Sequence, residues 1–259
     1  MNALTAEWTK LRTSPGPVWL LLGVIALTAG LGVLADTATK CPHLAGTCHL
    51  DPARTSLLGI YLSQAVVAVL AAGVISGEYG TGMIRVTLAA MPRRASLLTA
   101  KAAAVTGLVL VAGALAVAAA VLAGRLTLPG YALTAGHGYP PLSLADGTVL
   151  RAAAGSVLYL ALIALLALGI GTAVRNSAAA MGVVLGLLYL IPIIASTVTN
   201  ASWHRHLEQL APMTAGLTIQ DTTGLGGLPL SPWAGLGVLA AWAAGALLLG
   251  GLLLRLRDA

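Results

Sequence analysis

Two cysteines, Cys41 and Cys48, are the only ones in the chain, and they share a short segment with His43 and His49. These side chains suit two chemistries: a disulfide that closes a small loop in an oxidising compartment, or a zinc site made of thiolates and imidazoles. The spacing matches no common zinc site. A disulfide is the leading interpretation if the segment lies outside the cell, and two separate thiols remain the alternative.

A second group of metal-ligating side chains, His204, His206 and Glu208, follows farther along the chain. On a helix, His204 and Glu208 would lie on one side, because residues four apart face the same way, whereas His206 would point elsewhere. We therefore interpret this group as part of a water-exposed outer segment and predict no metal site.

The sequence motifs of phosphate binding and hydrolysis do not occur. The chain has no G-x-x-x-x-G-K-[ST], and none of its three lysines follows a glycine. It also lacks G-x-S-x-G and H-E-x-x-H. We therefore predict that the chain is not an enzyme by itself and that any energy it uses comes from another subunit.

The composition indicates where these residues must be held. Of the 259 residues, 58% are hydrophobic and 8% are charged, and the mean hydropathy is +0.91. A soluble domain carries about a quarter charged residues, so we predict an all-α integral membrane protein. Six apolar runs approach or exceed the ~20 residues that cross ~30 Å of hydrocarbon. They cover about 17–35, 56–76, 96–123, 150–174, 177–199 and 233–254, in a single transmembrane domain over residues 1–259.

Basic residues decide the predicted orientation. With both termini in the cytoplasm, the inner segments hold nine Lys and Arg residues and the outer segments five, as the positive-inside rule requires. This asymmetry also accounts for the net charge of +6, so we predict no nucleic-acid partner.

A polar, basic segment over residues 77–94 separates the second and third runs. Its apolar positions repeat at helical spacing, which predicts a short amphipathic helix that ends at Pro92. Glu78 is expected near the N-terminal end of that helix, and Glu78 and Arg85 would orient it on a soluble partner. Because both are expected outside the hydrocarbon, replacing either should leave the chain folded. The apolar positions are Met83, Ile84, Thr87, Leu88 and Met91.

Two other segments are predicted to form helices at the membrane surface. Leu4, Trp8 and Leu11 recur at helical spacing ahead of Pro15, which predicts an N-terminal interfacial helix. Residues 203–217 are too apolar for an ordinary loop. We predict a helix there that dips into the outer leaflet and is interrupted by Pro212.

Inside the spans, Gln64 is the one strongly polar side chain. We expect it to hydrogen-bond a neighbouring helix, with contact to a substrate path as the alternative. Pro192 is expected to kink the fifth run. The small residues Ala178, Gly182 and Gly186 are expected to let another helix approach closely.

Over its whole length the chain resembles the permease subunits of type-2 ATP-binding-cassette exporters, especially the compact six-span permeases of actinobacteria. Residues 228–233 and 254–257 give weaker support to this resemblance. The motifs that carry it are Gly77-Glu78-Tyr79, Arg85, Thr87-Leu88-Ala89 and Pro92-Arg93-Arg94.

The resemblance implies an elbow helix at the N-terminus, a coupling helix over residues 80–91 and re-entrant outer helices before the last span. It further implies a bacterial plasma membrane, a second permease copy and two ATPase subunits, which would bind the ATP and Mg. The residues expected to couple the chain to an ATPase subunit are Glu78, Tyr79, Met83, Ile84, Arg85, Leu88 and Met91. The cysteine-bearing outer loop departs from the family pattern.

The expected function is export of a hydrophobic or amphiphilic compound, such as a drug, an antibiotic or a lipid-like molecule. Gln64 is the candidate residue on the substrate path. A membrane interaction or assembly factor that transports nothing is the alternative, and a membrane enzyme is the weakest one, because no polar cluster faces inward.

Overall fold

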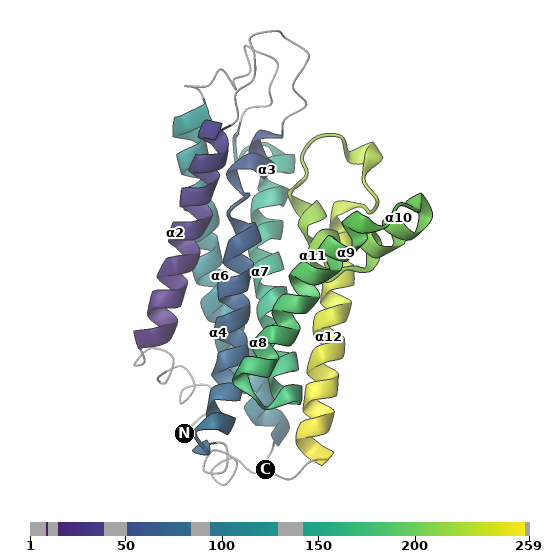
Figure 1. The fold of residues 1–259 in the computed structure, drawn as a ribbon. Helices are drawn as coiled ribbons and strands as arrows, with labels where there is room; N and C mark the ends of the chain where they lie inside the picture. Colours follow the sequence, from purple (N-terminus) through teal and green to yellow (C-terminus); the bar gives the residue numbers. More distant parts are fainter. Residues whose placement is uncertain (1–8, 10–14, 39–50, 84–93, 129–141, 257–259) are drawn as a thin grey trace.

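The structure, a computed structural model, describes residues 9, 15–38, 51–83, 94–128 and 142–256. Every regular element in these ranges is a helix, and six are long and apolar enough to cross a membrane (Figure 1). This confirms the predicted all-α class with six spans. The spans are α2 (Pro15–Ala38), α4 (Ile60–Gly80), α6 (Arg94–Thr127), α7 (Gly147–Val174), the broken run α8–η3–α9 (Ser177–Leu185, Gly186–Leu190 and Ile191–Thr197) and α12 (Pro232–Leu256).

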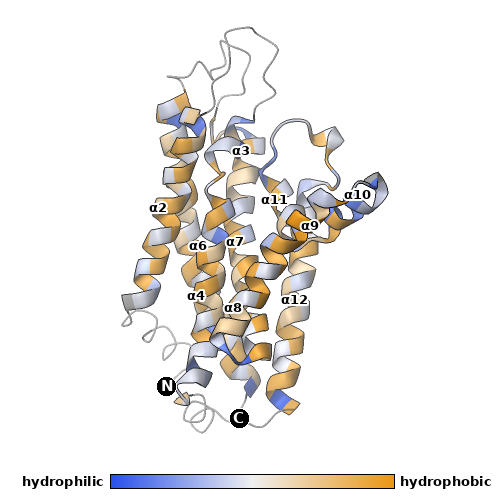
Figure 2. Ribbon diagram, in the orientation of Figure 1, coloured by the Kyte–Doolittle hydropathy of each residue, from blue (hydrophilic) through white to orange (hydrophobic). Residues whose placement is uncertain are grey.

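Short helices lie at one end of the bundle. We call this the outer end, and the opposite end, where α2 begins and α12 ends, the inner end; the inner end is the one predicted to face the cytoplasm. Hydrophobic residues follow the long helices, whereas hydrophilic ones gather toward the ends and on α10 (Figure 2). The short helices are α3 (Pro52–Ser56), α10 (Ala201–Leu210), α11 (Pro212–Leu217), η4 (Thr218–Gln220) and η5 (Leu225–Gly227).

Helix α7 is the centre of the bundle and packs against α4, α6 and α12. Its Tyr159, Leu160 and Ile163 are fully buried. Glycines allow α7 and α12 to approach closely: a Cβ on Gly169 would lie 2.5 Å from the carbonyl carbon of Ala246. The α7–α12 contact therefore depends on small residues, as is common between membrane helices.

The fifth span is broken where the sequence predicts a kink. A π-helical turn, η3, precedes Pro192, which is the second residue of α9. Proline has no N–H to donate and its ring collides with the preceding turn, so a wider turn accommodates it. In Figure 1 the run from α8 to α9 leans across the upright α12.

The small residues of the fifth span do not make the close approach that we expected, at least within this chain. Ala178 and Gly182 are exposed, and a Cβ on Gly182 or Gly186 would meet no atom within 4 Å. This face is therefore open toward the membrane.

Three predicted features lie outside the described residues. They are the N-terminal interfacial helix with Leu4, Trp8 and Leu11, the outer segment with Cys41 and Cys48, and residues 84–93 of the predicted coupling helix. Each of them stays a prediction.

Candidate functional site

The Gly-Glu-Tyr motif lies at the inner end of α4. We expected Glu78 at the start of a new helix, but it occupies the last turn of α4, which continues through Gly77 and ends at Gly80. That expectation was wrong because Gly77 does not end α4: a glycine inside a helix costs only about 1 kcal/mol, and the preceding turn is packed in the bundle, where Ile75 is fully buried. The chain turns immediately afterwards at Gly82, whose φ is +71°.

Glu78 forms a buried ion pair with Lys101 of α6. The Nζ atom of Lys101 lies 2.9 Å from Oε1 of Glu78, and the two side chains are 0% and 4% exposed. A charge in such surroundings is tolerated only with an opposite charge and hydrogen bonds beside it. Replacing Glu78 is therefore not the harmless surface change expected from the sequence.

Arginines join the neighbouring inner helix ends. The guanidinium carbon of Arg175 lies 5.2 Å from the ring centroid of Tyr79, a cation–π contact. Arg175 is the left-handed C-cap of α7, with φ of 62°, and its Nη2 donates to the carbonyl of Leu253 at 3.4 Å. From α6, Nη1 of Arg94 donates to the carbonyl of Leu254 at 2.6 Å. Positive groups at a helix C-terminus complement its dipole, so α12 is held at its inner end.

The residues proposed to couple the chain to an ATPase divide into two sets. Glu78 and Tyr79 face inward, toward α6 and the α7–α8 turn, whereas Met83 is 47% exposed just beyond α4. The others, Ile84, Arg85, Leu88 and Met91, lie outside the described residues. The structure thus identifies Lys101 and Arg175 as partners of the motif, which helical spacing alone does not reveal.

Gln64 lies in the second turn of α4, near its outer end, and is completely buried. Its Oε1 accepts a hydrogen bond from the Tyr159 hydroxyl of α7, which confirms the expected bond to a neighbouring helix. Its Nε2 lies 3.1 Å from the sulfur of Met213, in α11. A role for Gln64 on a substrate path stays a prediction.

The segment before the last span forms two helices that meet at Pro212, as predicted. Helix α10 is largely exposed, whereas Met213 and Ile219 are buried in the bundle beside α7 and α12. His204 and Glu208 share one side of α10, with 3.3 Å between Nε2 and Oε1. In the described part of the chain, no three His, Cys, Asp or Glu residues are grouped as metal ligands.

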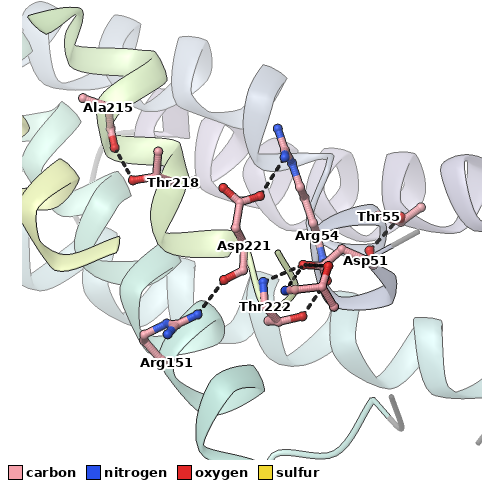
Figure 3. A network of polar contacts seen from close by, with 9 residues as sticks. Asp51, Arg54, Thr55, Arg151, Ala215, Thr218, Asp221 and Thr222 are labelled. Atoms are coloured by element: carbon pink, nitrogen blue, oxygen red, sulfur yellow. Dashed lines mark hydrogen bonds and ion pairs between the residues drawn. The ribbon is translucent and has the colours of Figure 1, made fainter. Parts of the chain in front are cut away.

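A polar network fastens this outer segment to α3 and α7 (Figure 3). Asp51 caps α3 and also accepts hydrogen bonds from the backbone N–H of Thr222, at 2.5 Å, and from its hydroxyl, at 2.7 Å. Arg54 of α3 pairs with Asp221, with 2.6 Å between Nη1 and Oδ1. Arg151 of α7 donates to the Asp221 carbonyl at 2.5 Å. Burial raises the pKa of Asp221 despite the neighbouring Arg54.

A smaller polar contact joins α2, α3 and α6 at the same end. The carboxylate of Asp36 is fully buried, and it accepts hydrogen bonds from the hydroxyls of Ser56, at 3.1 Å, and Thr127, at 3.3 Å. The outer ends of α2, α3 and α6 are thus joined through Asp36, a residue that the sequence alone shows only as one of the charges of the outer segments.

An apolar groove of about 660 Å³ opens between α7, the α8–η3 run and α12. Leu166 and Ile170 of α7, Leu187 of η3 and Leu249 of α12 are among its lining side chains. Trp242 of α12 also lines the groove, and its indole N–H donates to the carbonyl of Leu210, another lining residue, at 2.9 Å. The groove offers a ligand apolar contacts and few hydrogen bonds.

Similarity to a known protein family agrees with these structural features. A sequence model of the family described as ABC-2 family transporter protein matches residues 3–194, which include the Gly-Glu-Tyr motif and the first five spans almost entirely. No curated protein matches the chain. With its six membrane-spanning helices, the chain belongs to the ABC-2 family of transporter proteins.

Proposed function

We propose that the chain is the permease subunit of an ATP-driven exporter, with ATP and Mg bound by two separate ATPase subunits. Membership of the ABC-2 family and the absence of a phosphate-binding motif from the sequence support this role. The observation that carries the proposal is the Glu78–Lys101 ion pair, which joins the two helices that flank residues 84–93. A force applied to residues 84–93 would therefore act on α4 and α6 together.

The coupling helix would contact the ATPase through its apolar ridge of Met83, Ile84, Leu88 and Met91, since an amphipathic helix fills a groove on its partner. Arg85 would fix the orientation by charge-assisted hydrogen bonds. Glu78 and Tyr79 would act from within, because their partners belong to the same chain. They would hold the coupling helix against the bundle rather than bind the ATPase directly.

The groove beside α12 supports the proposal that the substrate is hydrophobic or amphiphilic, such as a drug, an antibiotic or a lipid-like molecule. Its volume of about 660 Å³ suits such a ligand, since small-molecule sites measure about 300–1,000 Å³. Leu187 contributes from the π-helical turn, so a change of shape in the fifth span would reshape the groove.

The assembly would contain a second permease copy in a bacterial plasma membrane, with both termini cytoplasmic. The distribution of Lys and Arg supports this orientation. A homodimer follows from the family resemblance, and the open small-residue face of α8 agrees with a further helix packing there.

Affinity purification of the tagged full chain from its native host, in mild detergent, tests this function. We expect a nucleotide-binding ATPase in a near-equal amount, together with ATP hydrolysis by the purified complex. A chain that purifies reproducibly without an ATPase would exclude the exporter role and favour a membrane interaction or assembly factor.

A further inference from the structure

A slot of about 320 Å³ lies between the first turns of α6 and the last turns of α12, on another face of α12 than the apolar groove. Leu98 of α6 and Leu247 of α12 form part of its walls, and Gly251 leaves room between them. A Cβ on Gly251 would already come within 3.3 Å of the Leu98 side chain. The walls are therefore apolar and the width is limited.

Two arginines line the inner mouth of this slot. Arg94 is held there by its hydrogen bond to the carbonyl of Leu254, and Arg255 is exposed in the last turn of α12. The carbonyl of Arg255 accepts a hydrogen bond from Nη1 of Arg94 at 3.4 Å, whereas its guanidinium forms no hydrogen bond or ion pair with any other described residue. In the described part of the chain, the two arginines are the charged side chains that line the slot, and no acidic side chain lines it.

The geometry points to a binding site for an anionic phospholipid. Its phosphate would lie between Arg94 and Arg255, because guanidinium groups bind phosphate by paired, charge-assisted hydrogen bonds. One acyl chain would follow the slot from Arg255 to Leu247, about 12 Å along the helix axis at ~1.5 Å per residue. Basic pockets between membrane helices bind anionic headgroups in this way.

A lipid fits this site better than a soluble partner does. Leu248 and Leu252, beside the slot, are 75% and 53% exposed on a helix apolar enough to span the membrane, so hydrocarbon covers them. A zwitterionic lipid would bring a positive group toward the two arginines and lose part of the attraction. The site is separate from the apolar groove, and the inference does not depend on the proposed transport function.

Native mass spectrometry of the full chain tests the site, with equal amounts of phosphatidylglycerol and phosphatidylcholine supplied as probes. We expect the chain to retain phosphatidylglycerol at least fivefold more than phosphatidylcholine. Arg255→Gln should lower the retained phosphatidylglycerol about fivefold, which corresponds to the loss of one arginine near an anionic surface. Arg255→Lys should keep most of it.

A slot-filling variant and a charge control complete the experiment. Ala95 lines the slot and is exposed, so Ala95→Leu should fill the slot without disturbing buried packing and should reduce retention of phosphatidylglycerol. Arg205→Gln removes the same charge from the exposed α10 and should change nothing. Equal retention of the two lipids by the unaltered chain, wild-type retention by Ala95→Leu, or equal losses in Arg205→Gln and Arg255→Gln would each overturn the proposal.

Discussion

The ammonium group of Lys101 lies 2.9 Å from the carboxylate of Glu78, and both side chains are buried between α4 and α6. The proposed coupling helix belongs to the segment of chain that links these two helices. The pair lies next to the contact of Tyr79 with Arg175, which in turn reaches α12. The inner ends of α4, α6, α7 and α12 are thus joined by charged side chains, so we expect them to move as one unit.

Removing one member of the buried pair should destabilise the fold. Glu78→Gln leaves the Lys101 charge beside a neutral amide, and breaking a buried pair on one side costs about 3–5 kcal/mol. For a chain of this size we expect the midpoint of thermal unfolding to fall by on the order of 10 °C. Thermal unfolding of the purified chain in detergent measures this fall.

The double variant Glu78→Gln, Lys101→Met provides the matched comparison. It removes both charges, so most of the lost stability should return. If Glu78→Gln unfolds at the wild-type temperature, the pair does not hold the inner ends together.

The spans and their interruptions could be predicted from the sequence because each depends on local chemistry. Apolar runs longer than the hydrocarbon thickness predict membrane helices whatever their neighbours. Pro192 and Pro212 break helices wherever they stand inside one, and the structure changes helix type or direction at both. Only the bounds differ: α4 runs to Gly80 instead of ending near residue 76.

The partners of the charged side chains could not be predicted, because each pair joins residues far apart in the sequence. Lys101 and Arg175 look like ordinary inner charges under the positive-inside rule, yet they contact Glu78 and Tyr79. At the outer end, Arg54 and Asp221 are separated by most of the chain and form an ion pair. Charge counting predicts which side of the membrane such residues occupy but not their partners.

Asp221 should make stability depend on pH. Burial raises the pKa of this carboxyl in the folded chain, so the folded state binds a proton more readily than the unfolded state. Its contribution therefore stabilises the fold at low pH and is lost as pH rises through the folded pKa. Asp221→Asn should remove that contribution, so the melting temperature of wild type relative to this variant should fall as pH rises from the ordinary pKa of an aspartate through the raised one.

Asp146 is the control of opposite sign. Hydrogen bonds from the hydroxyl and the backbone N–H of Thr148 lower the pKa of the Asp146 carboxyl. Relative to Asp146→Asn, wild type should therefore lose stability as pH falls through the lowered pKa. The same pH trend in both comparisons would show that Asp221 is not shifted as described.

Filling the apolar groove should impair binding of a hydrophobic ligand. Gly245 lines the groove and has open space around its Cα, so Gly245→Leu would place a side chain inside without a clash. We expect at least a tenfold weaker affinity for the fluorescent dye Nile red, measured by titration of the purified chain.

Gly237→Leu is the matched control for that titration. Gly237 is exposed on the same helix with similar space around it, but it does not line the groove. Equal dye affinities of the two variants would remove the groove from the substrate path.

Cys41 and Cys48 are predicted to form a disulfide. A bridge across so short a loop should contribute roughly 2–3 kcal/mol of stability. Mass spectrometry of unreduced protein should find the segment two hydrogens lighter than after reduction, and Cys41→Ser should abolish that difference. Two free thiols in protein prepared without reductant would contradict the prediction.

We propose that residues 84–93 dock on an ATPase at the inner end of the bundle. The most direct measurement places a photoreactive amino acid at Leu88 in one variant and at Leu225, exposed in η5 at the outer end, in another. After illumination of intact cells, the chain should be crosslinked to the nucleotide-binding subunit from position 88 and not from position 225. A crosslink to that subunit from position 225, or none from position 88 while the complex still hydrolyses ATP, would contradict the claim.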